Sequence, residues 1–294
     1  MKIKKAIIPA AGFGTRFLPI TKTIQKEMLP ILSKPIIDYL VDDCINAGIE
    51  EIIFVVNEND DQIQDYYSEN LYFKRYLERM NKADRYQLIG NIHAKARFSF
   101  VFQKESDPYG TAVPVLLAKD YVNNEEAFLV VMGDDYFFNA DGSNEIKKMI
   151  EVFEKSGSKG LVNCIQVAKE LVGKYGIAEY REENGYKYLT NQIEKPQPEQ
   201  VSSNFVTISK FVFTPEIFKY IDTQDVDNKS GELYLTTAYN KFAQENKMVI
   251  YEPEGVYLDS GYVIGWLKAN NIMAKNNPVI WDELRPFLKE LIAD

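Results

Sequence analysis

Short apolar runs alternate with amphipathic segments along the first half of the chain. Runs rich in Ile, Val and Phe, which are typical of buried strands, lie at residues 5–8, 51–56, 98–102 and 127–132. Residues 35–45 instead have apolar side chains at helical spacing, with Pro35 near the start and Gly48 beyond the end, and a second helix is predicted near 112–121. Strands that alternate with helices predict an α/β fold, in which a mostly parallel mixed sheet carries helices on both faces.

The spacing of the elements changes after residue 156. Turn signals such as Asn184-Gly185 separate runs that predict closely spaced strands, at residues 160–167, 186–193 and 206–213. The pattern then predicts helices at 215–221 and 233–244, a strand at 248–252 and a helical region from Gly261. We therefore expect a single domain over residues 1–294, with a first half at 1–156, a smaller β-rich half at 157–260 and a C-terminal helical segment at 261–294.

Composition limits the classes of protein to which the chain can belong. Its net charge is −9, and proteins that bind nucleic-acid backbones need a surplus of Lys and Arg, so we expect no nucleic-acid partner. Two distant cysteines and one histidine cannot build a zinc site or a Ser-His-Asp triad. Residues 66–85, which are aromatic and charged, predict a solvated helical insertion. Without a signal-peptide pattern or a membrane-length apolar run, we expect a cytoplasmic protein with reduced thiols and no membrane partner.

The first apolar strand runs directly into a glycine loop that carries fixed positive charge. Gly12 and Gly14 can adopt φ > 0 without steric cost, so the backbone N–H groups of residues 11–15 can converge on one anion. Arg16 and Lys26 add two cations. The spacing lacks the third glycine of a dinucleotide-binding turn and the Gly-Lys-Ser/Thr of a Walker loop. The stretch predicts a cradle for a triphosphate; the alternative is a glycine-rich turn with two solvated cations.

Carboxylates follow a predicted buried strand at Gly133-Asp134-Asp135. Ligands bind at the carboxyl ends of strands in open α/β sheets, and Mg²⁺ usually takes one or two carboxylates together with phosphates and water. A second carboxylate, Asp259, lies in the strand-turn stretch 257–261. Each Asp alone is typical of a helix cap or a turn. Together with the glycine loop, the two predict a metal site.

A further group of polar residues follows the predicted strand at 186–193. Glu194, Lys195 and Pro196 end this strand, and Tyr175-Gly176 lie before it. The compact ammonium of Lys195 suits a phosphate, and the carboxylate of Glu194 can accept hydrogen bonds from neighbouring sugar hydroxyls. The group is compatible with a sugar-phosphate site; the alternative is an ordinary charge pair at a strand end.

These motifs resemble those of the sugar-1-phosphate nucleotidylyltransferases. The family signature Gly-x-Gly-Thr-Arg, followed by a Lys-containing segment that ends in Leu-Pro, matches residues 12–16 and 26–30, and the resemblance covers roughly residues 4–265. The amino-acid sequences of residues 17–22 and 26–30 resemble those of the bacterial branch of the family, which uses UTP and glucose 1-phosphate. The resemblance implies a Rossmann-like nucleotide-diphospho-sugar transferase fold, with the nucleotide bound by 1–156 and the sugar phosphate by 157–260.

The resemblance also implies a reaction and a set of site residues. The implied reaction converts UTP and α-D-glucose 1-phosphate to UDP-glucose and pyrophosphate, by in-line attack of the sugar phosphate on the α-phosphorus. Arg16 and Lys26 would be catalytic, and Asp134 and Asp259 would bind Mg²⁺. The positions that match the family's nucleotide-binding residues are Ala10, Ala11, Gly12, Gly14, Thr15, Gln103 and Gly110. Those that match its sugar-phosphate-binding residues are Gly176, Glu194 and Lys195. A homo-oligomer, dimeric or tetrameric, is also implied.

Two departures from the family leave other reactions open. Pro108 stands where the uridylyltransferases have a glycine whose N–H contacts the base, and proline has no N–H to donate. Thr237 stands where an Asp is usual. One alternative is the same type of reaction with dTTP or GTP, or with mannose 1-phosphate. The other is a catalytically weak paralogue that binds nucleotide-sugars.

Overall fold

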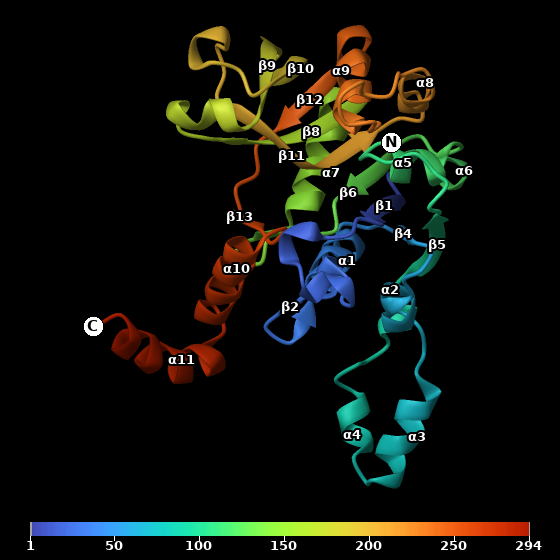
Figure 1. The fold of residues 1–294 in the computed structure, drawn as a ribbon, viewed down its shortest axis with the longest axis vertical. Helices are drawn as coiled ribbons and strands as arrows, with labels where there is room; N and C mark the ends of the chain where they lie inside the picture. The colour runs from blue at the N-terminus through green and yellow to red at the C-terminus, as the bar shows by residue number, and fades with distance from the viewer. Residues whose placement is uncertain (1, 294) are drawn as a thin grey trace.

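A nine-stranded mixed sheet forms the centre of the molecule in the computed structural model, which describes residues 2–293 (Figure 1). The strand order is β5-β4-β1-β6-β11-β8-β12-β10-β9. The bounds of these strands are β1 Lys5–Ala10, β4 Glu51–Asn57, β5 Arg97–Gln103, β6 Phe128–Val131, β8 Gly160–Gln166, β9 Gly176–Glu183, β10 Tyr186–Glu194, β11 Phe205–Phe213 and β12 Met248–Tyr251. Two further sheets pair β2 (Pro30–Ile31) with β3 (Lys34–Pro35) and β7 (Asp135–Phe138) with β13 (Val256–Asp259).

The sheet is parallel in its first half and mainly antiparallel in its second. Strands β5, β4, β1 and β6 run parallel, so their carboxyl ends meet at one edge. Strand β11 is antiparallel to both β6 and β8, and β10 is antiparallel to β9 and β12, whereas β12 is parallel to β8. The strands of the β-rich half therefore extend the same sheet. The predicted α/β class with a mixed sheet is confirmed.

Helices cover both faces of the sheet, because successive strand side chains point to opposite sides. Ile7 of β1 and Phe128 of β6 pack on one face with α5, α8 and α9, and their neighbours Ile8 and Leu129 pack on the other with α1 and α7. The helices of the main body are α1 Ile36–Asn46, α2 Gln62–Tyr66, α5 Val113–Leu117, α6 Lys119–Val122, α7 Glu145–Ser156, α8 Ile217–Asp222 and α9 Leu235–Glu245. The helix predicted near 112–121 is thus two short helices, which meet at Ala118.

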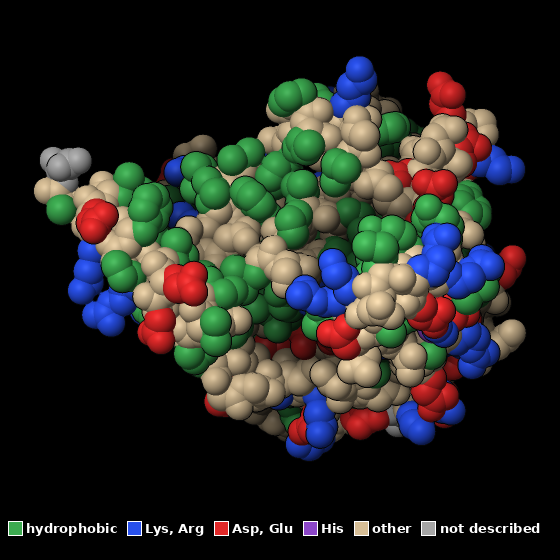
Figure 2. All heavy atoms as spheres, turned by 90° about the horizontal axis from the view of Figure 1, so that it is seen from below, with side chains coloured by type: hydrophobic (Ala, Val, Ile, Leu, Met, Phe, Trp, Pro, Cys, Tyr) green, Lys and Arg blue, Asp and Glu red, His purple; other side chains and the backbone are tan. Residues whose placement is uncertain are grey.

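Two helical pairs project from this body (Figure 1). The predicted insertion forms α3 (Leu71–Arg79) and α4 (Ala83–Tyr86), which are mostly exposed. The C-terminal segment forms α10 (Val263–Lys275), which packs against β2 and β13, and α11 (Pro278–Leu291), which has no buried residue. Hydrophobic side chains lie along the C-terminal segment, at the left of Figure 2. Among residues 2–293, none of the helices combines the length and the apolar character needed to cross a membrane.

Candidate active site

The loop after β1 carries its glycines and cations to the carboxyl edge of the parallel strands. Gly14 has a φ of 59°, in the left-handed region, whereas Gly12 lies outside that region. The Thr21 hydroxyl donates to the Gly14 carbonyl at 2.9 Å, and a short 3₁₀ helix begins at the next residue. A Cβ atom at Gly14 would lie 3.1 Å from the Cβ of Lys26. Glycine is therefore needed here both for the backbone conformation and for the close approach of Lys26.

Lys26 lies between two carboxylates. Its Nζ is 2.5 Å from Oδ2 of Asp134 and 3.5 Å from Oε1 of Glu27. Burial lowers the pKa of Lys26, but the attraction of Asp134 and Glu27 outweighs it, so the pKa lies above its ordinary value. Lys26 therefore keeps its charge at neutral pH and can bind a phosphate.

Glu27 is a buried carboxylate that sequence reasoning missed, although it lies inside the Lys-Glu-Met-Leu-Pro motif. Its side chain is 1% exposed and its Oε2 has no hydrogen-bond partner. Burial raises the pKa of Glu27 to about 7, against the attraction of Lys26. Gly133 makes room for this side chain, because a Cβ there would lie 2.8 Å from Cγ of Glu27.

The two predicted metal ligands come together at the end of β13. The Ser260 N–H donates to the Asp134 carbonyl at 3.1 Å, and the Gly261 N–H donates to Oδ1 of Asp259 at 3.0 Å. A Cβ atom at Gly261 would lie 2.9 Å from Oδ2 of Asp134 and 3.2 Å from Oδ1 of Asp259. Burial, together with the charge of Asp134, raises the pKa of Asp259 against the hydrogen bond from Gly261.

This pair fits a divalent cation that is also bound by substrate. Two carboxylates that repel one another are stabilised by a shared cation, and Mg²⁺ needs only one or two of them when phosphates and water complete its shell. Within residues 2–293, no group of three or more His, Cys, Asp and Glu side chains could hold a metal ion without such help. The donor set is therefore suited to a metal that enters with a phosphorylated ligand.

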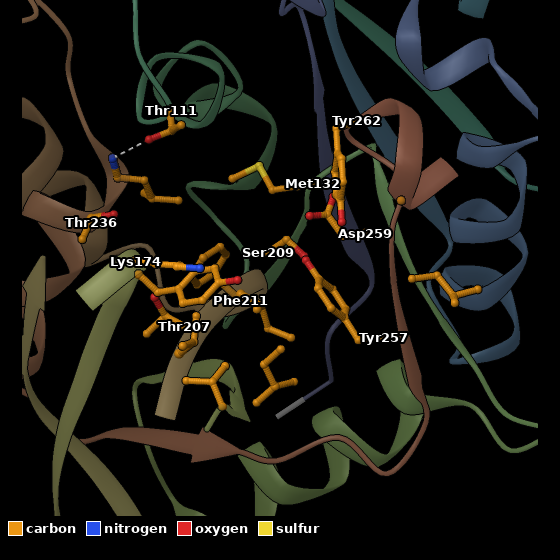
Figure 3. A pocket seen from close by; sticks show the side chains of 18 of the residues that line it. Thr111, Met132, Lys174, Thr207, Ser209, Phe211, Thr236, Tyr257, Asp259 and Tyr262 are labelled. Carbon is orange, nitrogen blue, oxygen red and sulfur yellow. Dashed lines mark hydrogen bonds between the residues drawn. The ribbon is translucent and has the colours of Figure 1, made fainter. Parts of the chain in front are cut away.

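A cavity of about 930 Å³ lies beside this pair (Figure 3). Its lining includes four predicted site residues: Arg16, Glu194, Lys195 and Asp259. The predicted site residue Gly176 does not line it, but it pairs with Glu194 across β9 and β10, and a Cβ there would lie 2.8 Å from Oε2 of Glu194. Lys195 has a φ of 45°, and its N–H donates to the Tyr175 carbonyl at 2.9 Å. The backbone thus turns sharply at the point where Glu194 and Lys195 reach the cavity.

A second cavity, of about 340 Å³, adjoins the first, and both are lined by Thr111 and Met132. Its predicted site residues are Ala11, Gly12, Lys26, Gln103, Gly110 and Asp134. Three predicted nucleotide-binding residues, Ala10, Gly14 and Thr15, line neither cavity. The carbonyl of Ala10 accepts a hydrogen bond from the Gln25 side chain at 2.9 Å.

The loop at 108–111 is held by the segment that leads into α9. Gly110 has a φ of 130°, and this loop lies against the Leu233 backbone, whose carbonyl accepts from the Ala112 N–H at 2.9 Å and whose N–H donates to the Tyr109 carbonyl at 2.8 Å. The Thr111 hydroxyl accepts from the backbone N–H of Leu235 at 2.9 Å, as the dashed line in Figure 3 marks. This loop therefore joins a wall of the smaller cavity to the helix that lines the larger one.

The backbone of Pro108 makes a hydrogen bond with the side chain of Gln103. Nε2 of Gln103 donates to the Pro108 carbonyl at 3.3 Å, and the Gln103 side chain is 9% exposed. This hydrogen bond is accepted by the proline carbonyl, so the N–H that proline lacks makes no difference to it.

Sequence reasoning missed several other charged residues of the two cavities. Lys174 and Lys268 line the larger cavity, and Glu232 lines the smaller one. Lys268 lies on α10, where no motif marks it. Glu232 directly precedes Leu233, whose backbone holds the loop at 108–111.

Comparisons with known proteins agree with this geometry. The family described as "Nucleotidyl transferase" matches residues 5–276. The UTP--glucose-1-phosphate uridylyltransferase of Staphylococcus epidermidis is 35% identical over 291 residues, which cover 99% of both chains. That of Bacillus subtilis is 34% identical over 292 residues, which cover 99% of this chain and 98% of the relative.

Solved structures give the same result. A UDP-glucose pyrophosphorylase complexed with UDP-glucose has a TM-score of 0.80 at 33% identity, covering 94% of this chain and 100% of the other. A UTP-bound UGPase from Acinetobacter baumannii has a TM-score of 0.86 at 28% identity, covering 99% and 100%. The fold, the motifs and these similarities lead to one conclusion: the chain belongs to the nucleotidyl transferase family.

Proposed function

We propose that the protein transfers the uridylyl group of UTP to glucose 1-phosphate, which forms UDP-glucose and pyrophosphate. The observation that carries this proposal is the pair of adjoining cavities. The smaller is lined by Ala11, Gly12 and Lys26, and the larger by Arg16, Glu194 and Lys195. A triphosphate and a sugar phosphate would therefore have adjoining places, which share Thr111 and Met132 as a common wall. The printed names of the relatives support UTP and glucose 1-phosphate as the substrates.

The chemistry needs positioning and charge neutralisation, because the attacking oxygen is already an anion. Arg16 and the amides of the glycine loop would hold the β- and γ-phosphates as pyrophosphate leaves. Lys26 and Lys195 would bring the sugar phosphate toward the α-phosphorus. A Mg²⁺ ion held by Asp134 and Asp259 would supply further positive charge to the phosphates.

Lys26 has a role in the substrate-free protein as well. In the absence of substrate, its ion pair with Asp134 compensates both charges in a partly buried site. A phosphate that approaches Lys26 competes with Asp134 for the ammonium and leaves this carboxylate free for a metal. Binding of substrate and binding of metal would therefore favour one another.

We propose that the protein is cytoplasmic and that it forms a homo-oligomer. Cys44 and Cys164 are buried free thiols, as expected in a reducing compartment. Val279, Phe287 and Leu291 on α11 are 76%, 57% and 63% exposed in a single chain, and a second copy of the chain would cover them. The molar mass of the protein and of its Phe287→Glu variant by light scattering tests this part, because a monomeric wild type contradicts it.

The test of the reaction is pyrophosphate release with each nucleoside triphosphate and with glucose or mannose 1-phosphate. We expect the highest kcat/KM for UTP with glucose 1-phosphate, and dTTP as the closest competitor. A higher efficiency with GTP, ATP or CTP would overturn the uridylyl assignment. Absence of pyrophosphate release with every pair would favour a paralogue that only binds nucleotide-sugars.

A further inference from the structure

A buried ion pair that none of the motifs predicts lies at the start of β7, directly after Asp134. Lys210 is 1% exposed and Asp135 is 3% exposed. Nζ of Lys210 donates to Oδ1 of Asp135 at 2.5 Å and to its carbonyl at 3.3 Å, and it lies 4.9 Å from the centre of the Phe137 ring. The other carboxylate oxygen of Asp135 accepts a hydrogen bond from the Tyr257 hydroxyl at 3.0 Å. Both oxygens of Asp135 are therefore engaged.

These contacts join the strands that carry Asp134 and Asp259. Strand β7 begins at Asp135, directly after Asp134, and β13 ends at Asp259. The two strands are antiparallel, and Asp135 pairs with Asp259. The hydrogen bond from Tyr257 to Asp135 thus crosses from one strand to the other, within two residues of each metal-binding carboxylate. Figure 3 shows Tyr257 and Asp259 on the same side of the larger cavity.

An irregularity in β11 brings Lys210 to this place. Ile208 pairs with Asn163 of β8 and Phe211 pairs with the adjacent Val162, so Ser209 and Lys210 form a bulge. Bulges turn a side chain away from its regular direction and often occur next to active sites. The Ser209 carbonyl accepts from the Met132 N–H at 3.0 Å, which holds the bulge against the end of β6. Gly133 and Asp134 follow Met132 directly.

Stability alone does not explain the presence of this ion pair. Removing two charges from water costs several kcal/mol per ion, and well-packed apolar residues of similar size often serve as well or better. A pair of charges does, however, fix the relative position of its partners by directed hydrogen bonds. This is the property that two carboxylates need when they share one cation, since misplaced ligands weaken metal binding.

We propose that Lys210 is a positioning residue, which acts through Asp135 and Tyr257 to fix the spacing of Asp134 and Asp259 for a divalent cation. Its ion pair is with Asp135 and not with either metal-binding carboxylate, so it acts through strands β7 and β13. The inference rests on the proposed function, because it assumes that these carboxylates bind the metal. It adds a role for three residues that the reaction itself does not require.

The test measures Mn²⁺ binding by electron paramagnetic resonance, in the complex with UDP-glucose and without turnover. The variant Asp135→Asn with Lys210→Met removes both charges together, so no lone charge is left buried. We expect it to bind Mn²⁺ at least about tenfold more weakly than the wild type. Tyr257→Phe removes one hydroxyl and should fold normally, with a smaller weakening of the same kind.

The chain offers a close match for a control. Asp38 is also buried, at 3% exposed, and it accepts hydrogen bonds from Tyr67 at 3.0 Å and from Lys95 at 3.1 Å. The variant Asp38→Asn with Lys95→Met therefore removes a similar set of hydrogen bonds away from the carboxylate pair, and Lys34 stays beside Asp42, which Lys95 also contacts. We expect it to lower the melting temperature but to leave the affinity for Mn²⁺ unchanged.

The outcomes separate this inference from the function on which it rests. Unchanged Mn²⁺ affinity in the Asp135/Lys210 double variant would overturn the role of Lys210, as would equal weakening in the Asp38/Lys95 control. If the double variant does not fold, unchanged affinity in Tyr257→Phe overturns it instead. If the wild type complex binds no Mn²⁺, the proposed metal pair is wrong and the inference is wrong with it.

Discussion

The ammonium of Lys26 lies 2.5 Å from a carboxylate oxygen of Asp134, although 108 residues separate the two in sequence. One residue belongs to the glycine loop after β1, and the other follows β6, the strand adjacent to β1. The parallel pairing of β1 and β6 brings both to the same edge of the sheet. The residue proposed to bind phosphate and the residue proposed to bind metal are thus in direct contact.

The first prediction concerns the two cations of the loop. Arg16→Ala and Lys26→Ala should each lower kcat/KM by at least about a hundredfold, because each removes a donor that acts on developing phosphate charge. Steady-state pyrophosphate release measures this. Lys22→Ala, an exposed lysine of the same loop, is the matched control and should keep nearly full activity. Near-normal rates in an intact Arg16 or Lys26 variant contradict the assigned roles.

The second prediction concerns the metal. Activity should vanish with a chelator and return with Mg²⁺ or Mn²⁺, because two adjacent carboxylates alone repel the phosphates. Asp134→Asn and Asp259→Asn should both raise the Mg²⁺ concentration that gives half-maximal rate. Titrating Mg²⁺ in the pyrophosphate assay tests this, and an unchanged metal requirement in both variants excludes the site.

The third prediction separates the two cavities. Lys195→Ala should raise the KM for glucose 1-phosphate far more than the KM for UTP, because Lys195 lines the larger cavity while Ala11, Gly12 and Lys26 line the smaller. Glu194→Gln should reduce the preference for glucose 1-phosphate over mannose 1-phosphate. Initial rates with each substrate varied in turn give both results. Equal changes in the two KM values would mean that Lys195 holds the nucleotide or only supports the fold.

The fourth prediction concerns the nucleobase. Gln103 lines the smaller cavity, where its side chain is tied to the Pro108 carbonyl. Loss of one neutral hydrogen bond costs roughly 0.5–1.5 kcal/mol, or about two- to tenfold in affinity. Gln103→Ala should therefore narrow the ratio of kcat/KM between UTP and CTP by that factor, because uracil and cytosine differ in the donors and acceptors that they present. A ratio that stays the same shows that the base is recognised elsewhere.

The fifth prediction follows from the buried carboxylate of Glu27, whose pKa is raised from 4.5 to about 7 by burial. Since the folded state favours the protonated form, Glu27 contributes most to stability below pH 4.5 and loses this contribution as the pH rises through about 7. Relative to Glu27→Gln, the wild type should lose at most about 3 kcal/mol of unfolding free energy across this window. Urea unfolding of both proteins from pH 4.5 to 8 measures the difference. A difference that does not change with pH would contradict a raised pKa.

Much of the fold could be predicted from apolar runs, but the strands β7 and β9 could not. Every residue of β6 is buried, so its sequence is apolar throughout. Strand β7 instead begins at Asp135, whose charge is compensated by a lysine 75 residues away in sequence. Strand β9 carries several charged residues along its half-exposed length. Helix α7 did leave a signal, since Asn144 caps its start and Gly157, with a φ of 62°, ends it.

In the candidate site too, some residues could be proposed from the sequence and others could not. Arg16, Lys26 and Asp134 lie in short local motifs, so residue type and spacing were enough to propose them as site residues. Lys210 could not be identified, because its role depends on a bulge in β11 and on a partner from another strand. Residue spacing in a sequence does not specify such pairings.

Isotopic labelling of the individual phosphorus atoms of UTP shows directly which of them the sugar phosphate attacks. With glucose 1-phosphate and UTP labelled in the α-phosphate, the account predicts that the label appears in UDP-glucose. With UTP labelled in the γ-phosphate, it predicts that the label appears only in pyrophosphate. Transfer of the γ-label to the sugar phosphate, or α-label that never enters UDP-glucose, would contradict attack of the sugar phosphate on the α-phosphorus.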